Sequence, residues 1–141
     1  MLYLDTSSLL KYLLPEPGDE AAEAAIHREE EVAVSQLAEL EAAVQLRARH
    51  LGGALRPRLY HALLAKLQAL DKESPFVFQA LSGQVFPTAL RQHRKGESVH
   101  CRSLDRLHLA AMEELGITRL MTHDARQAMA ARALGFEVIT P

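Results

Sequence analysis

The order of apolar runs along the chain limits the fold more than any other feature. Short runs rich in branched or aromatic side chains alternate with longer stretches that repeat apolar residues at helical spacing, which is typical of βαβ units around a parallel sheet. The expected strands are residues 2–4, 31–34, 118–122 and 136–140, and the expected helices are 7–14, 19–30, 36–50, 57–71, 103–115 and 124–134. The stretch 74–100 is ambiguous, with a strand at 76–78 and a helix near 84–94 as its best candidates. We therefore predict an α/β fold whose mostly parallel sheet has four to five strands.

Composition excludes several classes of protein. The chain has 141 residues, 48% of them hydrophobic, so we expect residues 1–141 to form one domain with its own core. The single cysteine, Cys101, cannot form an internal disulfide or a Cys-rich zinc site, which favours a reducing compartment and hence the cytoplasm. No apolar run is long enough to span a membrane. A net charge of −2 lacks the basic signature of a DNA-coating protein.

Two aspartates stand where predicted strands end. Asp5 follows the strand at 2–4, and Asp124 closes the turn after the strand at 118–122. Open α/β sheets bind their ligands at the carboxyl ends of the strands. Each aspartate also precedes a predicted helix, so each could instead serve only as a helix N-cap. Both interpretations remain open on the sequence alone, although the repetition of the arrangement favours a functional role.

The helix at 36–50 carries two glutamates, which helical geometry separates. A stripe of apolar residues is expected to face the core: Leu37, Leu40, Val44, Ala48 and Leu51. At about 100° per residue, Glu41 lies about 60° from the centre of that stripe and Glu39 about 140° away, on the solvent side. A carboxylate that borders a core needs a cation, a hydrogen-bond network or a wet cleft. Glu41 is therefore the candidate functional residue, with a structural salt bridge to an arginine as the alternative.

The fourth candidate acid is Asp105, in the first turn of the helix at 103–115. A negative charge there also suits the helix dipole, so a purely structural role is equally compatible. The buried face of this helix is expected to consist of Leu104, Leu107, Ala111 and Leu115. His108, one turn after Asp105, could donate a hydrogen bond to it.

Four such carboxylates in one small domain predict a pocket of negative charge that needs compensation. Divalent cations that prefer oxygen ligands, Mg²⁺ or Mn²⁺, compensate such a pocket best. These ions can also activate water for attack on a phosphodiester.

Four segments together resemble the motifs of PIN-domain ribonucleases, in order and spacing, and the chain length resembles that of their VapC toxin branch. The segments are "YLDTSSLLKYL", "SQLAELEAAVQLRAR", "SLDRLHLAAM" and "LMTHDARQAMAARALGFEVITP". The resemblance implies a three-layer α/β/α fold, cleavage of RNA, an antitoxin protein as partner, and a homodimer. It further implies that Asp5, Glu41, Asp105 and Asp124 bind Mg²⁺ or Mn²⁺ and carry catalysis, while Thr6, Ser7 and Thr122 orient a carboxylate or a water.

The chain departs from the family pattern in two places, and other functions fit its sequence less well. Ala38 replaces a small hydroxyl residue, and segment 54–100 matches no family motif. The main alternative is a PIN-fold module that binds RNA or protein without cleaving it. The pair His123–Asp124 does not fit the all-helical HD hydrolases, because it follows a strand. The haloacid-dehalogenase phosphatases need a second aspartate at position 7, which is Ser7 here.

Overall fold

The computed structural model describes residues 1–14, 16, 19–95 and 99–141. Within these ranges five strands form one parallel sheet with the order β3-β2-β1-β4-β5. The strands are β1 (Leu2–Leu4), β2 (Val32–Ser35), β3 (Phe76–Gln79), β4 (Arg119–Met121) and β5 (Glu137–Ile139). The predicted α/β class and strand count are confirmed, and β3 resolves the ambiguity after residue 74.

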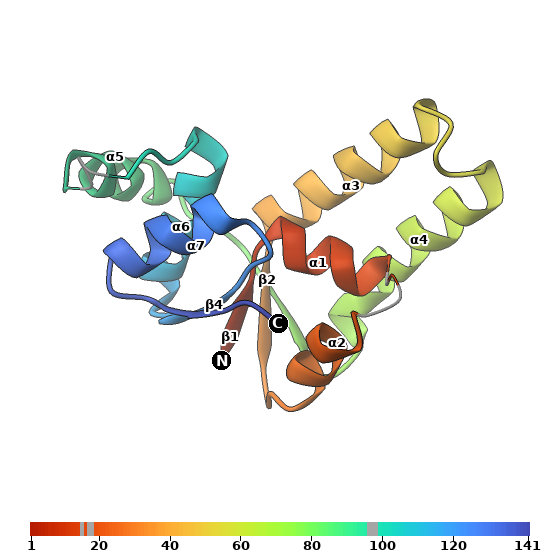
Figure 1. The fold of residues 1–141 in the computed structure, drawn as a ribbon, viewed down its shortest axis with the longest axis horizontal. Helices are drawn as coiled ribbons and strands as arrows, with labels where there is room; N and C mark the ends of the chain where they lie inside the picture. The colour runs from red at the N-terminus through yellow and green to blue at the C-terminus, as the bar shows by residue number, and fades with distance from the viewer. Residues whose placement is uncertain (15, 17–18, 96–98) are drawn as a thin grey trace.

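Helices cover both faces of the sheet and form three layers (Figure 1). One face carries α1 (Thr6–Leu13), α2 (Glu20–His27), α3 (Gln36–Leu51) and α4 (Pro57–Ala69), which continues into the 3-10 turn Leu70–Lys72. The other face carries α5 (Val85–Lys95), α6 (Ser103–Leu115) and α7 (Ala125–Ala133). In Figure 1, α3 and α4 form a hairpin that extends beyond the sheet. The largest boundary error is at the end of α2, which was expected at residue 30 and lies at His27.

Alternating side chains of each strand feed two separate cores. Leu2 and Leu4 pack with α1 to α4, whereas Tyr3 between them packs with α5 to α7. The period of two in a strand sends neighbouring side chains to opposite faces, and because helices cover both faces, all three residues are fully buried. The uninterrupted apolar run of β1 therefore has a simple cause.

The apolar face expected for α3 was wrong. Its fully buried residues are Ala38, Ala42 and Leu46, whereas Leu40 and Val44 are 63% and 57% exposed. Because α3 projects beyond the sheet beside α4, its contacts come from α1 and α4 as well as from β2. Small alanines fill that contact, and the larger apolar residues of the opposite stripe face solvent.

The expected face of α6 was partly wrong as well. Ala111 is buried as predicted, but Leu104 is 47% exposed, and Arg106 and His108 are buried in its place. Segment 54–100, which matched no family motif, contains α4, β3 and α5, with residues 96–98 outside the described part. None of the helices in the described ranges is long and apolar enough to cross a membrane.

Candidate metal centre at the carboxyl edge of the sheet

The strand order creates a crevice beside β1. The chain builds the sheet from β1 outward through β2 to β3, then returns to place β4 on the other side of β1. At such a switch point the loops after the two neighbouring strands diverge, which leaves room for a ligand. Asp5 follows β1 and Asp124 follows β4, so both lie at this point.

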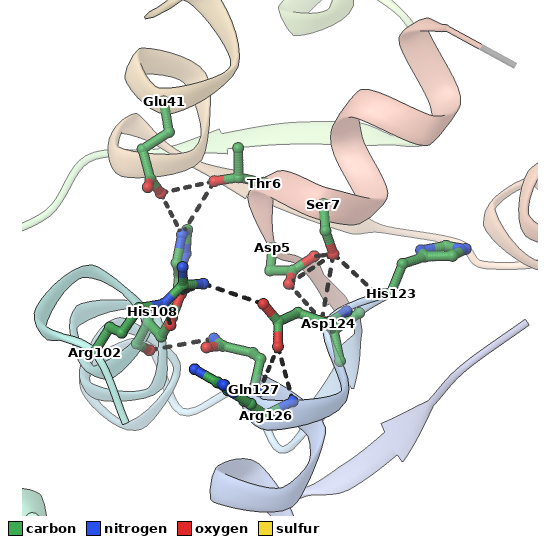
Figure 2. Close-up of polar contacts among 12 residues, drawn as sticks. Asp5, Thr6, Ser7, Glu41, Arg102, His108, His123, Asp124, Arg126 and Gln127 are labelled. Atoms are coloured by element: carbon green, nitrogen blue, oxygen red, sulfur yellow. Dashed lines mark hydrogen bonds and ion pairs between the residues drawn. The ribbon is translucent and has the colours of Figure 1, made fainter. Parts of the chain in front are cut away.

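A cleft of about 480 Å³ opens there, and all four predicted carboxylates line it: Asp5, Glu41, Asp105 and Asp124. They come from four segments that lie far apart in the sequence: the end of β1, the second turn of α3, the first turn of α6 and the start of α7. Figure 2 shows three of them, Asp5, Glu41 and Asp124. Glu39, excluded by the helical argument, is not part of the lining. The fold thus brings together the residues that the sequence selected.

Asp5 is almost fully buried and has three hydrogen-bond partners, Ser7, Ser8 and Thr122. Its Oδ1 accepts the backbone N–H of Ser8 at 2.9 Å, which caps α1, and its carboxylate also accepts the hydroxyl of Ser7 at 2.7 Å. Thr122 Oγ1 donates to Oδ2 at 2.5 Å and accepts the backbone N–H of Asp124 at 3.0 Å. The helix-cap interpretation is therefore correct as far as it goes, and Thr122 additionally ties the ends of β1 and β4 together.

Asp105 and Asp124 share one cation. Arg102 Nε lies 2.7 Å from Asp105 Oδ2, and Arg102 Nη2 lies 3.1 Å from Asp124 Oδ2. The hydrogen bond and the charge of Asp105, followed by the charge of Asp124, raise the pKa of Arg102. The other oxygen of Asp124, Oδ1, caps α7 through two backbone N–H groups. Arg102 was not selected from the sequence, although it stands three residues before Asp105, a spacing at which two side chains of a helix can meet.

Glu41 is held by two side chains that contact the same oxygen. Thr6 Oγ1 and His108 Nε2 each lie 2.7 Å from Glu41 Oε2. Partial burial alone would raise the pKa of Glu41, but the hydrogen bonds from His108 and Thr6 outweigh it, and the pKa lies below its ordinary value. The alternative partner of Glu41, an arginine, and the hydrogen bond that His108 could have donated to Asp105 are both absent among the described residues. His108 faces the interior of the domain, where it meets Glu41 and Tyr3.

The hydroxyl residues selected from the sequence lie next to the carboxylates, but on different ones. Ser7 and Thr122 donate to Asp5, whereas Thr6 donates to Glu41. His123 hydrogen-bonds through Nδ1 to Ser8 Oγ at 3.0 Å. Figure 2 shows its ring turned away from the carboxylates of Asp5, Glu41 and Asp124.

The donor chemistry of the cleft fits a hard divalent cation. In the described part of the chain no group of three or more His, Cys, Asp or Glu side chains is arranged so that it could hold a metal ion as it stands. Mg²⁺, however, keeps most of its waters and commonly uses one or two protein carboxylates. The guanidinium between Asp105 and Asp124 already occupies a place where positive charge is stabilised. A metal bound there would compete with Arg102 for these oxygens.

Known proteins resemble this chain over almost its whole length. A family model for the PIN domain matches residues 2–133. Ribonuclease VapC46 of Mycobacterium tuberculosis is 30% identical over 142 residues, which cover 99% of this chain and 97% of that protein.

Solved structures resemble the fold at low sequence identity. VapC20 of Mycobacterium tuberculosis, a toxin that cleaves the sarcin-ricin loop, has a TM-score of 0.74 at 15% identity, with full coverage of both chains. FitAcB from Neisseria gonorrhoeae has a TM-score of 0.73 at 18% identity and covers 100% of this chain and 98% of its own. A toxin–antitoxin complex from Klebsiella pneumoniae has a TM-score of 0.68 at 15% identity, with coverage of 100% and 98%.

Proposed function

The chain belongs to the PIN-domain family and to its VapC ribonuclease branch, and from this membership we propose that it is a Mg²⁺- or Mn²⁺-dependent endoribonuclease, the toxin of a toxin–antitoxin pair. The observation that carries the proposal is the convergence of four carboxylates on one cleft, with an arginine between two of them. Helix capping alone does not explain why these four acids line the same cleft. A dense group of acids is costly unless a cation balances it.

The four acids of the cleft and two hydroxyl residues beside Asp5 have assigned roles in this proposal. Asp5, Asp105 and Asp124 would hold the metal, and Glu41 would complete the site or orient the attacking water. The bound metal would activate water and stabilise the charge that develops on the phosphodiester. Ser7 and Thr122 would keep the Asp5 carboxylate in one orientation.

The partners follow from the same proposal. An antitoxin protein would bind the chain and cover the cleft; the existence of such a partner is supported by a fold neighbour from Klebsiella pneumoniae that was solved as a toxin–antitoxin complex. RNA would be the substrate, and we expect a homodimer in the cytoplasm. Light scattering on the purified chain gives its mass and would show directly whether it is a monomer or a dimer.

The proposal is tested by cleavage of a mixed-sequence single-stranded RNA with Mg²⁺, with Mn²⁺ and with EDTA. Glu41→Gln and Glu39→Gln form a matched pair, because both change one glutamate of α3 and only Glu41 lines the cleft. We expect metal-dependent cleavage that falls at least about 100-fold in Glu41→Gln and is unchanged in Glu39→Gln. Equal activity in all three proteins would identify a contaminating nuclease. Metal-free RNA binding without cleavage would favour the alternative, a PIN-fold binding module.

A further inference from the structure

A chain of hydrogen bonds leads from the interior of the domain to Glu41. Ser35 Oγ lies 2.7 Å from Tyr3 Oη, Tyr3 Oη lies 2.8 Å from His108 Nδ1, and His108 Nε2 lies 2.7 Å from Glu41 Oε2. Ser35, Tyr3 and His108 are all at least 97% buried. The chain thereby joins β1, β2, α6 and α3; Glu41 and His108 line the cleft, whereas Tyr3 and Ser35 lie outside its lining.

The direction of each hydrogen bond can be worked out from the carboxylate end. An ionised carboxylate only accepts, so the hydrogen between His108 and Glu41 must lie on Nε2 of the ring. In a neutral ring Nδ1 then accepts, and Tyr3 donates to it. Burial raises the pKa of Tyr3, so its hydroxyl keeps its hydrogen.

The hydroxyl of Ser35 donates in the same direction, toward Tyr3. Ser35 Oγ accepts the backbone N–H of Ala38 at 3.2 Å, because Ser35 caps α3. Its own hydrogen is therefore available for Tyr3 Oη. With a neutral His108 ring, Ser35 donates to Tyr3, Tyr3 donates to His108, and His108 donates to Glu41, so that every hydroxyl and ring nitrogen of this buried chain has a partner.

The two oxygens of Glu41 are treated differently. Both hydrogen bonds to its side chain, from Thr6 and from His108, reach Oε2. Among the described residues Oε1 has no hydrogen-bond donor, and the side chain lines the cleft. The protein thus engages one oxygen and leaves the other for a ligand in the cleft.

We propose that Tyr3 and His108 are positioning residues that hold the Glu41 carboxylate with Oε1 directed to the ligand. The inference rests on the proposed function, because the ligand in question is the metal or its water. Tyr3 fixes the ring hydrogen of His108 on Nε2, and the ring then fixes Oε2. His108 lines the cleft but is 97% buried, Tyr3 lies outside the lining, and neither residue belongs to the acidic set.

The test uses the full chain with Tyr3→Phe, which removes one hydroxyl and keeps the buried ring. Tyr60→Phe is the matched control, since Tyr60 lies on α4 outside the cleft lining and its ring stacks on His50 at 4.6 Å between centroids. Two variants of the histidine complete the set: His108→Gln keeps a side-chain amide donor, and His108→Leu removes it. The readouts are the ring ¹⁵N resonances of His108 in metal-free protein, Mn²⁺ affinity by electron paramagnetic resonance, and the melting temperature.

We expect one ring form with hydrogen on Nε2 in the wild type and in Tyr60→Phe, and a mixture of forms in Tyr3→Phe. Mn²⁺ affinity should fall roughly tenfold in Tyr3→Phe and more in His108→Leu, and His108→Gln should restore most of it. Wild-type affinity in folded Tyr3→Phe and His108→Leu would overturn the inference while leaving the metal site intact. An Nδ1–H form in the wild type would overturn it too. If the wild type binds no Mn²⁺, the proposed function fails and the inference fails with it.

Discussion

The two sides of the cleft hold their carboxylates in different ways. Asp5 and Glu41 accept hydrogen bonds from hydroxyl groups, a backbone N–H and one imidazole, and most of these donors are buried. Asp105 and Asp124 instead share the side chain of Arg102, which is 60% exposed. A metal can approach the first side without displacing a charged partner, whereas on the second side it must replace the guanidinium. We therefore call the side of Asp5 and Glu41 preset, because its carboxylates are already held in place. We call the side of Asp105 and Asp124 adjustable, because its arginine must move.

The largest effect is expected on the preset side, from Asp5→Asn. Asparagine can still accept the Ser8 N–H and cap α1, because Asn and Asp are similar N-caps, so the fold should persist. The negative charge is lost, and RNA cleavage should fall at least about 100-fold, beyond the usual loss for a residue that only orients a ligand. Cleavage rates and melting temperature, measured on the same sample, separate the two roles. A large drop in melting temperature with proportionate loss of activity would reduce Asp5 to a cap.

Thr122→Val should give the next largest effect. The two side chains have nearly the same shape, but valine cannot donate to Asp5 or accept the N–H of Asp124. Mn²⁺ affinity should fall about 10- to 100-fold because the Asp5 carboxylate loses its orientation. Thr118→Val, at an exposed residue just before β4, is the matched control. Unchanged affinity in Thr122→Val would show that the preset side does not depend on this hydroxyl.

Arg102→Gln tests the adjustable side and should act in the opposite direction. Loss of the guanidinium removes a competitor for Asp105 and Asp124, so Mn²⁺ should bind roughly fivefold more tightly at low salt, with a smaller gain at high salt. The control is Arg126→Gln. This variant removes the same charge, but Arg126 contacts Asp124 through its backbone N–H, which the substitution keeps. Isothermal titration measures both. Weaker binding in Arg102→Gln alone would mean that Arg102 assists the metal instead of competing with it.

The smallest effect concerns the stability of the Glu41 contact. The pKa of Glu41 is lowered from its ordinary 4.5, so the folded state favours the ionised form. The resulting stabilisation is present above about pH 4.5 and is lost as the pH falls through the folded-state pKa. Urea unfolding of the wild type and Glu41→Gln should differ by about 1 kcal/mol at pH 5 and converge toward pH 3. A gap that widens in acid would contradict the direction of the shift.

Sequence patterns predicted the elements and the acids because both follow from local rules. Asp5 and Asp124 could be selected since strand ends in a parallel sheet meet at one edge, and Glu41 could be chosen over Glu39 from helical phase. Glu41 does line the cleft and Glu39 does not, although most of the stripe used to separate them faces solvent. The helical pattern does not reveal which side of a projecting hairpin meets its neighbours.

The partners of the acids were harder to predict because they depend on tertiary packing. His108 could have bonded to Asp105 by spacing alone, but the register of α6 against β1 directs it to Tyr3 and Glu41. Arg102 combines a local contact with Asp105 and a distant one with Asp124, and only the first has a signal in the sequence. The partners that balance the charge of the cleft could therefore be identified only from the structure.

The most direct test of the account is a crystal structure of the chain soaked in MnCl₂, with anomalous scattering to locate the metal. We predict a manganese peak among Asp5, Asp105 and Asp124, with Arg102 moved off both carboxylates and the Asp5 side unchanged. A peak elsewhere, or full occupancy of Arg102 between Asp105 and Asp124 at saturating Mn²⁺, would contradict the claim that this cleft is a metal centre.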